Sequence, residues 1–145
     1  MSSSGHRIVR VWIDTDVALG EARGDVDDGF ALAALLAARR LSGLEVLGIS
    51  TVFGNTTAAR SRECAREIVR RAGEPVAVLC GAEEPGQSSA AADAIAALEP
   101  DVELLCLGPL TNVAAACRRD PELPARLRFR AVGGSLSSPG FLPPL

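Results

Sequence analysis

The chain has 145 residues, enough for one domain that removes about 70% of its unfolded surface from water, and 48% of them are hydrophobic. Aromatic residues amount to only 3%, so the core is expected to be aliphatic. The net charge of −3 and the pI near 5.2 exclude a broadly basic surface for nucleic acid, so a small or neutral ligand is the better expectation.

Short β-rich apolar runs alternate with longer runs at helical spacing, the pattern of repeated βα units. In chain order, the pattern predicts a strand over residues 7–13, a helix over 27–41, a strand over 44–51, a helix ending near 71, and a strand over 76–79. It then predicts a loop over 81–89, a helix over 90–98, a strand over 102–107, a helix over 112–119 and a strand over 127–132. We therefore expect an α/β protein with an open, mostly parallel, Rossmann-like sheet of about five strands and helices on both faces.

The same pattern sets the expected domain boundaries. Residues 7–135 are predicted to form one α/β domain, between a disordered tail over 1–6 and an irregular, proline-containing tail over 136–145. The N-terminal residues lack the apolar core of a signal peptide, and no apolar run approaches the roughly 20 residues of a membrane-spanning helix. The four cysteines are widely spaced with no C-x-x-C pair, which favours reduced thiols. We expect a cytoplasmic protein that does not bind membranes.

Residues 13–28 stand out because they hold six carboxylates and one arginine, a formal charge of −5. Such a run is often a solvated face, and that interpretation stays open. Here, however, the acids lie between a predicted strand and a predicted helix, where they would converge. Converging carboxylates repel one another unless a cation, a proton or hydrogen-bond donors offset the repulsion, so the segment favours a metal site.

Other polar residues follow the ends of the predicted strands. In parallel α/β sheets, ligands bind at the carboxyl ends of the strands, where loops and helix N-termini gather. The residues at this edge are Asp14 and Asp16 after the first strand, Asn55 after the second, Thr111 and Asn112 after the fourth, and Gly133 and Gly134 after the fifth. Asn112 is read either as part of this edge or as a turn or cap residue.

These segments resemble the motifs of a known family, the inosine-uridine type nucleoside hydrolases, which cleave the N-glycosidic bond of ribonucleosides. Asp14-Thr15-Asp16, then Asp27-Asp28 and an Ala/Leu-rich helix, look like the family's N-terminal signature. Gly54-Asn55 is similar to the family's Gly-Asn turn, and residues 108–112 are similar to its Gly-Pro-Leu-Thr-Asn element. Gly133-Gly134 is similar to its Gly-Gly turn. In this order the motifs extend over nearly the whole chain.

The resemblance implies a calcium site and a general base. Asp16 and Asp28 would hold Ca²⁺ with their carboxylates, and Thr111 would add its main-chain carbonyl. Hard oxygen ligands suit calcium better than zinc. Asp16 would also deprotonate the attacking water, whose acidity the ion increases.

The resemblance also implies how a ribonucleoside substrate is held. Asp27 and Asn55 would hydrogen-bond the ribose hydroxyls, and Asp14 would orient the metal ligands from behind. A group of carboxylates suits the oxocarbenium-like transition state of such a hydrolysis. Glu21 and Asp25 are expected on a solvated bulge.

Three features differ from the family's pattern. The loop over residues 17–26 is longer than the family's short connection, and no His-Gly element follows Gly81. Family members are also about twice as long, and their C-terminal half brings further groups to the metal and the substrate. Without that half, apolar surface and a sheet edge would be exposed, so we expect self-association, as a homo-oligomer or through that surface.

Two alternatives remain open. Residues 11–19 also resemble the strand and Asp-x-Asp loop of haloacid-dehalogenase-like phosphatases, in which Asp14 would be the nucleophile and Asp16 the acid or base, with magnesium. That chemistry normally uses a lysine, and this chain has none. The second alternative is a non-catalytic fragment that binds calcium or ribose.

Overall fold

The centre of the molecule is a five-stranded sheet, in a computed structural model that describes residues 8–22, 24–39 and 43–133. The strands are β1 (Val9–Thr15), β2 (Leu44–Thr51), β3 (Val78–Cys80), β4 (Val102–Cys106) and β5 (Arg128–Ala131). They lie in the order β3-β2-β1-β4-β5, and every neighbouring pair is parallel. The predicted tails over residues 1–6 and 136–145 lie outside the described residues.

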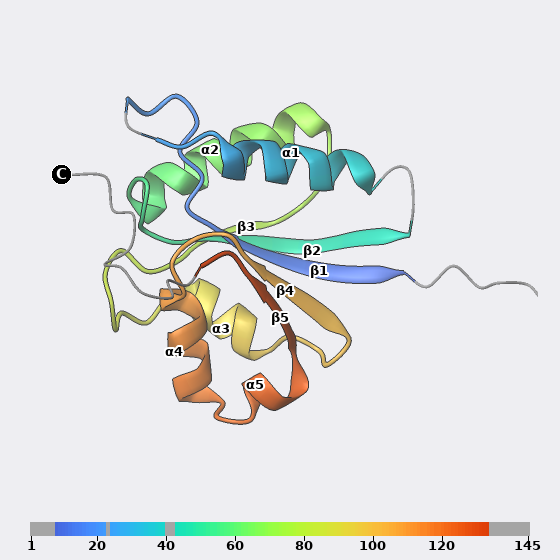
Figure 1. The fold of residues 1–145 in the computed structure, drawn as a ribbon, viewed down its shortest axis with the longest axis vertical. Helices are drawn as coiled ribbons and strands as arrows, with labels where there is room; N and C mark the ends of the chain where they lie inside the picture. Colours follow the sequence, from blue (N-terminus) through green and yellow to red (C-terminus); the bar gives the residue numbers. More distant parts are fainter. Residues whose placement is uncertain (1–7, 23, 40–42, 134–145) are drawn as a thin grey trace, which may run out of the picture.

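Helices cover both faces of this sheet (Figure 1). One face carries α1 (Asp27–Ala38) and α2 (Ala58–Ala72), and the other carries α3 (Ala90–Ala96), α4 (Thr111–Arg119) and the short α5 (Leu123–Arg126). The α/β class and the parallel five-stranded sheet predicted from the sequence are therefore confirmed.

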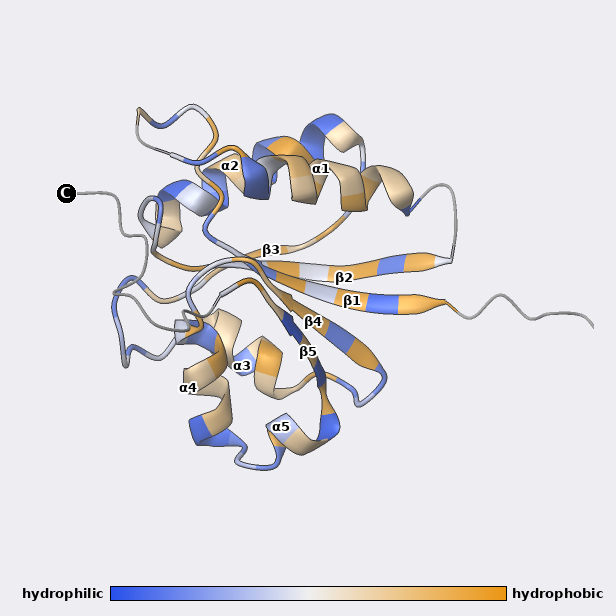
Figure 2. Ribbon diagram, viewed as in Figure 1, coloured by the Kyte–Doolittle hydropathy of each residue, from blue (hydrophilic) through white to orange (hydrophobic). Residues whose placement is uncertain are grey.

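The core forms because β1 is buried on both sides, as is usual for the central strand of a parallel sheet. Successive side chains of a strand point to opposite faces. Val11 and Ile13 accordingly pack in the cluster that includes Leu32 and Leu36 of α1, whereas Trp12 packs with Leu104 in the cluster on the other face. Figure 2 shows hydrophobic residues along the strands.

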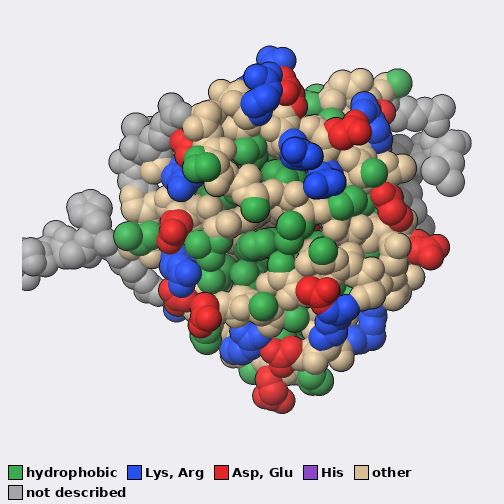
Figure 3. Space-filling view, turned by 180° about the vertical axis from the view of Figure 1, so that it is seen from behind, with side chains coloured by type: hydrophobic (Ala, Val, Ile, Leu, Met, Phe, Trp, Pro, Cys, Tyr) green, Lys and Arg blue, Asp and Glu red, His purple; other side chains and the backbone are tan. Residues whose placement is uncertain are grey.

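Large hydrophobic side chains also remain at the surface. Phe30 and Val132 each expose 73% of their area, and Val26 and Leu110 about half. Figure 3 shows a further group of hydrophobic side chains in the middle of the reverse face, with charged side chains around it. No helix within the described ranges has both the length and the apolar character needed to span a bilayer.

The element boundaries differ from prediction at several ends. β1 runs to Thr15 and not to residue 13, because the backbone of Asp14 still pairs with Ser50 of β2 and Cys106 of β4. The sequence pattern predicted an earlier end because the last side chains of β1 are polar, whereas strand pairing depends on backbone hydrogen bonds. β3 covers residues 78–80 and not 76–79, and the one-turn helix α5 was missed.

Candidate functional site

A pocket of about 630 Å³ opens at the carboxyl ends of the strands. Its walls include residues from four separate segments of the chain: Asp16, Asp25, Asp27, Asp28, Asn55 and Gly108. All six predicted site residues were expected to gather here or directly behind this edge. The pocket brings together Asp16, Asp27, Asp28 and Asn55.

Asp16, the first of these, directly follows β1 and is 6% exposed. The backbone N–H of Asn55 donates to its Oδ2 at 2.8 Å. Glycines permit this close packing, because a Cβ on Gly54 would lie 2.0 Å from Asp16 Oδ2 and one on Gly108 would lie 2.9 Å from Asp16 Oδ1. Burial, partly offset by the Asn55 bond and reinforced by the nearby Asp28 charge, raises the pKa of Asp16 to about 6.

Asp28 lies in the first turn of α1 and is 8% exposed. Its Oδ2 accepts from Thr15 Oγ1 at 2.5 Å and from the Asp16 N–H at 3.2 Å. These contacts reach back to the end of β1 and none of them caps α1. Asp28 therefore does more than occupy a helix end, and the carboxylates of Asp16 and Asp28 lie close together in the pocket.

Asp25 and Asp27 line the more exposed side of the pocket. Asp27 Oδ1 accepts from the Asp28 N–H at 2.8 Å, and Asp25 Oδ1 accepts from the Val26 N–H at 2.7 Å. Both side chains thus hold the start of α1 while they face the pocket. Asp25 was expected on a solvated bulge; it is exposed, but it also lines the pocket, a position that the sequence pattern did not predict although Asp25 lies two residues before Asp27.

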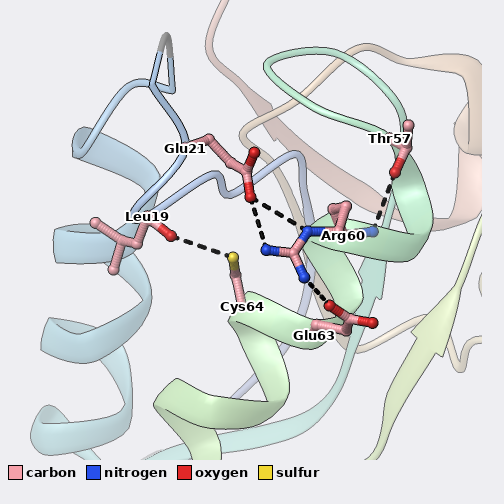
Figure 4. A network of polar contacts seen from close by, with 6 residues as sticks. All are labelled: Leu19, Glu21, Thr57, Arg60, Glu63 and Cys64. Carbon is pink, nitrogen blue, oxygen red and sulfur yellow. Dashed lines mark hydrogen bonds and ion pairs between the residues drawn. The ribbon is translucent and has the colours of Figure 1, made fainter.

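The long loop between β1 and α1 is fastened to α2 (Figure 4). Arg60 donates through Nη2 to Glu21 Oε1 at 2.8 Å, and the Cys64 thiol donates to the Leu19 carbonyl at 3.4 Å. Glu21 therefore forms an ion pair with Arg60 on the neighbouring helix, as well as being partly exposed.

Asp14 lies directly behind the pocket and is fully buried. Its Oδ1 accepts from Ser50 Oγ at 2.5 Å and from Asn112 Nδ2 at 2.9 Å, whereas its Oδ2 has no hydrogen-bond partner among the residues that the structure describes. Burial raises the pKa of Asp14 to about 6, against the opposing effect of its two hydrogen bonds. Its position agrees with the predicted supporting role, which stays a prediction.

Asn112 is neither a turn residue nor a cap. It is fully buried inside α4, where its Nδ2 donates to Asp14 Oδ1 and to the Thr51 carbonyl, and its Oδ1 accepts from the Ala82 N–H at 2.9 Å and from Ser89 Oγ at 3.1 Å. The sequence offered only its place in the Gly-Pro-Leu-Thr-Asn segment as a signal for this role.

Thr111 is the first residue of α4 and lines a different pocket, of about 330 Å³, together with Gly86 and Arg118. Its neighbour Leu110 lines both this pocket and the acid pocket. The predicted metal ligand at this position was the main-chain carbonyl of Thr111, and that role stays a prediction.

The donor set of the pocket suits an oxygen-preferring cation. Asp16 and Asp28 offer two buried, neighbouring carboxylates, and the described lining of the pocket contains no Lys or Arg to neutralise them. The described residues contain no group of three or more His, Cys, Asp or Glu side chains placed to hold a metal. The two carboxylates would thus supply only part of a ligand set for Ca²⁺, which needs about 6 to 8 oxygens including carbonyls and waters, and calcium binding stays a prediction.

Comparison with known proteins gives a consistent result. The model of the family described as "Inosine-uridine preferring nucleoside hydrolase" matches residues 11–144. Two proteins of Oryza sativa subsp. japonica are similar to this chain: probable uridine nucleosidase 1 is 29% identical over 91% of this chain, and probable uridine nucleosidase 2 is 28% identical over 97%. The chain spans about half of their length, 48% and 51%.

Solved structures show the same fold. An inosine-guanosine nucleoside hydrolase superimposes with a TM-score of 0.71 at 25% identity, over 94% of this chain and 52% of that one. A plant nucleoside hydrolase gives a TM-score of 0.70 at 22% identity, over 88% of this chain and 48% of that one. The predicted resemblance is confirmed, and the chain belongs to the inosine-uridine preferring nucleoside hydrolase family.

Proposed function

We propose that this chain carries the metal- and ribose-binding part of a calcium-dependent nucleoside hydrolase, which splits a ribonucleoside into free base and ribose. The observation that carries the proposal is the convergence of Asp16 and Asp28, two buried carboxylates, in the pocket at the sheet edge. Membership of the family and the relatives' names support the reaction class.

Asp16 is the proposed general base. A pKa near 6 leaves its carboxylate ionised at neutral pH and still basic enough to take a proton from the attacking water. The water oxygen attacks C1′ of the ribose, the C1′–N bond breaks, and its electron pair leaves with the base, which takes up a proton. A bound calcium ion would supply a Lewis acid that makes water more acidic at neutral pH.

Asp27 and Asn55 are the proposed ribose ligands, since both line the same pocket as the acid pair. Carboxylates accept hydrogen bonds from sugar hydroxyls, and their charge favours the positive charge that develops on the ribose ring. Asp28 and the Thr111 carbonyl would hold the ion with Asp16, and Asp14 would support them from below.

The phosphatase alternative finds no support. It requires Asp14 as a nucleophile, but this side chain is fully buried and does not line the pocket. It also requires a cation that balances the phosphate charge, and the chain has no lysine.

The decisive assay is release of free base and reducing sugar from inosine, uridine and other nucleosides. Asp16→Asn keeps the size of the side chain and removes the base, so the rate should fall by about 10²–10⁴-fold. Glu67→Gln on α2 is the matched control and should keep full activity. If the unmodified chain binds calcium but hydrolyses no nucleoside, the non-catalytic alternative replaces this proposal.

Calcium is tested separately by thermal melting in chelator and in millimolar calcium. Binding only to the folded chain should stabilise it by about 2.7 kcal/mol at a hundredfold excess over Kd. Asp16→Asn and Asp28→Asn should each remove most of the shift, and magnesium should produce a smaller one. Equal melting temperatures with and without calcium would remove the metal from the proposal.

We also propose that the chain associates with itself through exposed apolar side chains. Val26, Phe30, Leu110 and Val132 are between 49% and 73% exposed, and Leu110 and Val132 also line the acid pocket. Large apolar side chains that gather at a surface favour association in water. Sedimentation should reveal oligomers that Phe30→Glu dissociates, whereas a single monomer peak at all concentrations would contradict association.

A further inference from the structure

The segment from Leu107 to Asn112 is attached to Asp14 at both of its ends. At its start, the Leu107 N–H donates to the Asp14 carbonyl at 2.8 Å. At its end, Asn112 Nδ2 donates to the Asp14 carboxylate at 2.9 Å. One residue of the central strand therefore fixes both ends of the loop that separates β4 from α4.

The middle of this loop forms a wall of the acid pocket. Gly108, Pro109 and Leu110 line the pocket. Gly108 packs closely on Asp16, because a Cβ at position 108 would lie 2.9 Å from both the backbone nitrogen and the Oδ1 of Asp16. The separation between the loop and β1 thus decides how much room remains above the Asp16 carboxylate. Any change in the attachment at Asn112 would change that room.

The Asn112 side chain also ties together two other loops. Its second N–H bonds the Thr51 carbonyl at the end of β2, and its oxygen accepts from Ala82 after β3 and from Ser89 at the start of α3. All four hydrogen bonds that a primary amide readily makes are therefore present. Gly81 permits this packing, because any larger residue at position 81 would place its Cβ 2.3 Å from Asn112 Nδ2.

We propose that Asn112 is a positioning residue: its amide clamps the 107–111 loop onto Asp14 and so sets the geometry of the pocket around Asp16. Its effect on calcium and substrate rests on the proposed function, whereas the clamp itself does not. Asn112 acts through Asp14 and the loop, since it is buried and does not line the pocket. Removing a supporting group of this kind typically lowers metal affinity by about 10–100-fold.

The first test is hydrogen exchange of the calcium-free chain, which needs neither metal nor substrate. In Asn112→Ala, amides of residues 107–111 and 81–83 should exchange at least about 10-fold faster, while those of α2 change little. Ser50→Ala is the matched control, because it removes the other donor to the same Asp14 oxygen without touching the loop. It should leave the 107–111 amides within about threefold of the unmodified chain.

A purely structural role gives a different result. Exchange would then accelerate equally in all segments, or equally in Asn112→Ala and Ser50→Ala, and either outcome overturns the clamp. If Asn112→Ala does not fold, Asp14→Ala removes the same bond from its other partner. The amides of residues 107–111 should then lose protection in Asp14→Ala but keep it in Asp14→Asn, whose amide oxygen still accepts from Asn112, and equal protection in the two variants contradicts the proposal.

Calcium titration supplies the functional readout. Asn112→Ala should bind calcium about 10–100-fold more weakly, and Ser50→Ala by less than about threefold. Unchanged affinity in folded Asn112→Ala would overturn the positioning role. If the unmodified chain binds no calcium, the proposed metal function fails, while the exchange experiment still decides whether the clamp exists.

Discussion

The outer surface of α2 and the pocket at the sheet edge both carry carboxylates, but their charges are balanced in opposite ways. On α2, Glu67 pairs with Arg70 and Arg71 at 2.7 Å, and these cations lower the pKa of Glu67 to about 2. In the pocket, Asp16 and Asp28 lie side by side with no Lys or Arg among the described lining residues, and burial raises the pKa of Asp16.

This difference distinguishes carboxylates that are paired at the surface from carboxylates that are candidates for a functional role. The α2 pairs are exposed, so water and salt already screen them and they add little to stability. The pocket acids are buried with like charges, an arrangement that opposes folding and persists only where something else favours it. Strongly perturbed carboxylates in a cleft are therefore candidates for chemistry, whereas the α2 surface needs no such explanation.

The largest effect is expected when the buried charge behind the pocket is removed. Folding raises the pKa of Asp14 from 3.8 to about 6, so between pH 4 and 6 the folded chain retains a proton that the unfolded chain has released. Stability should therefore fall as pH rises through this window and then level off. In chelator at pH 7, Asp14→Asn should raise the free energy of unfolding by up to about 3 kcal/mol.

Urea denaturation at pH 4, 5, 6 and 7 measures this effect. The gain should be smallest at pH 4, where Asp14 is protonated in the folded state and the unfolded chain has released only part of this proton, and the stability of the variant should decline less steeply with pH. Asp16 keeps its own raised pKa, so a residual slope remains. A variant that loses stability at pH 7 would show that the Asp14 charge is already compensated.

An intermediate effect, on the rate of nucleoside hydrolysis, is expected from Gly54→Ala. The new methyl would lie 2.0 Å from Asp16 Oδ2, so the carboxylate must move although no charge is altered. A displacement of about 1 Å in a catalytic group costs about 10²-fold in rate. Nucleoside hydrolysis by Gly54→Ala and by Glu67→Gln should differ by about that factor, and equal rates would remove Asp16 from the reaction.

The sequence predicts the parts of this comparison that depend on local patterns. Apolar runs of β and helical spacing located the strands and helices, because each element must bury one side against the core. Asp14 and Asp16 could be placed at the carboxyl edge because they follow an apolar run directly. The resemblance of residues 108–112 to a family motif predicted that this segment lies at the site.

What the sequence could not predict depends on contacts between distant segments. The hydrogen bond between Asn112 and Asp14 joins residues 98 positions apart. The sequence around Asn112 does not distinguish this role from that of a helix cap. The Glu21–Arg60 pair joins a loop to a helix 39 positions away. The end of β1 was misplaced because it is set by pairing with β2 and β4, which the identity of its side chains does not reveal.

The smallest effect is expected where charges are already paired in water. Glu67→Gln breaks two contacts with Arg70 and Arg71, yet its melting temperature should change by less than about 2 °C, because exposed pairs gain little from each other. The same variant in 1 M NaCl should differ even less, since the Debye length falls to about 3 Å. A loss as large as the Asp14→Asn gain would mean that paired surface charge, and not burial, governs the electrostatics of this chain.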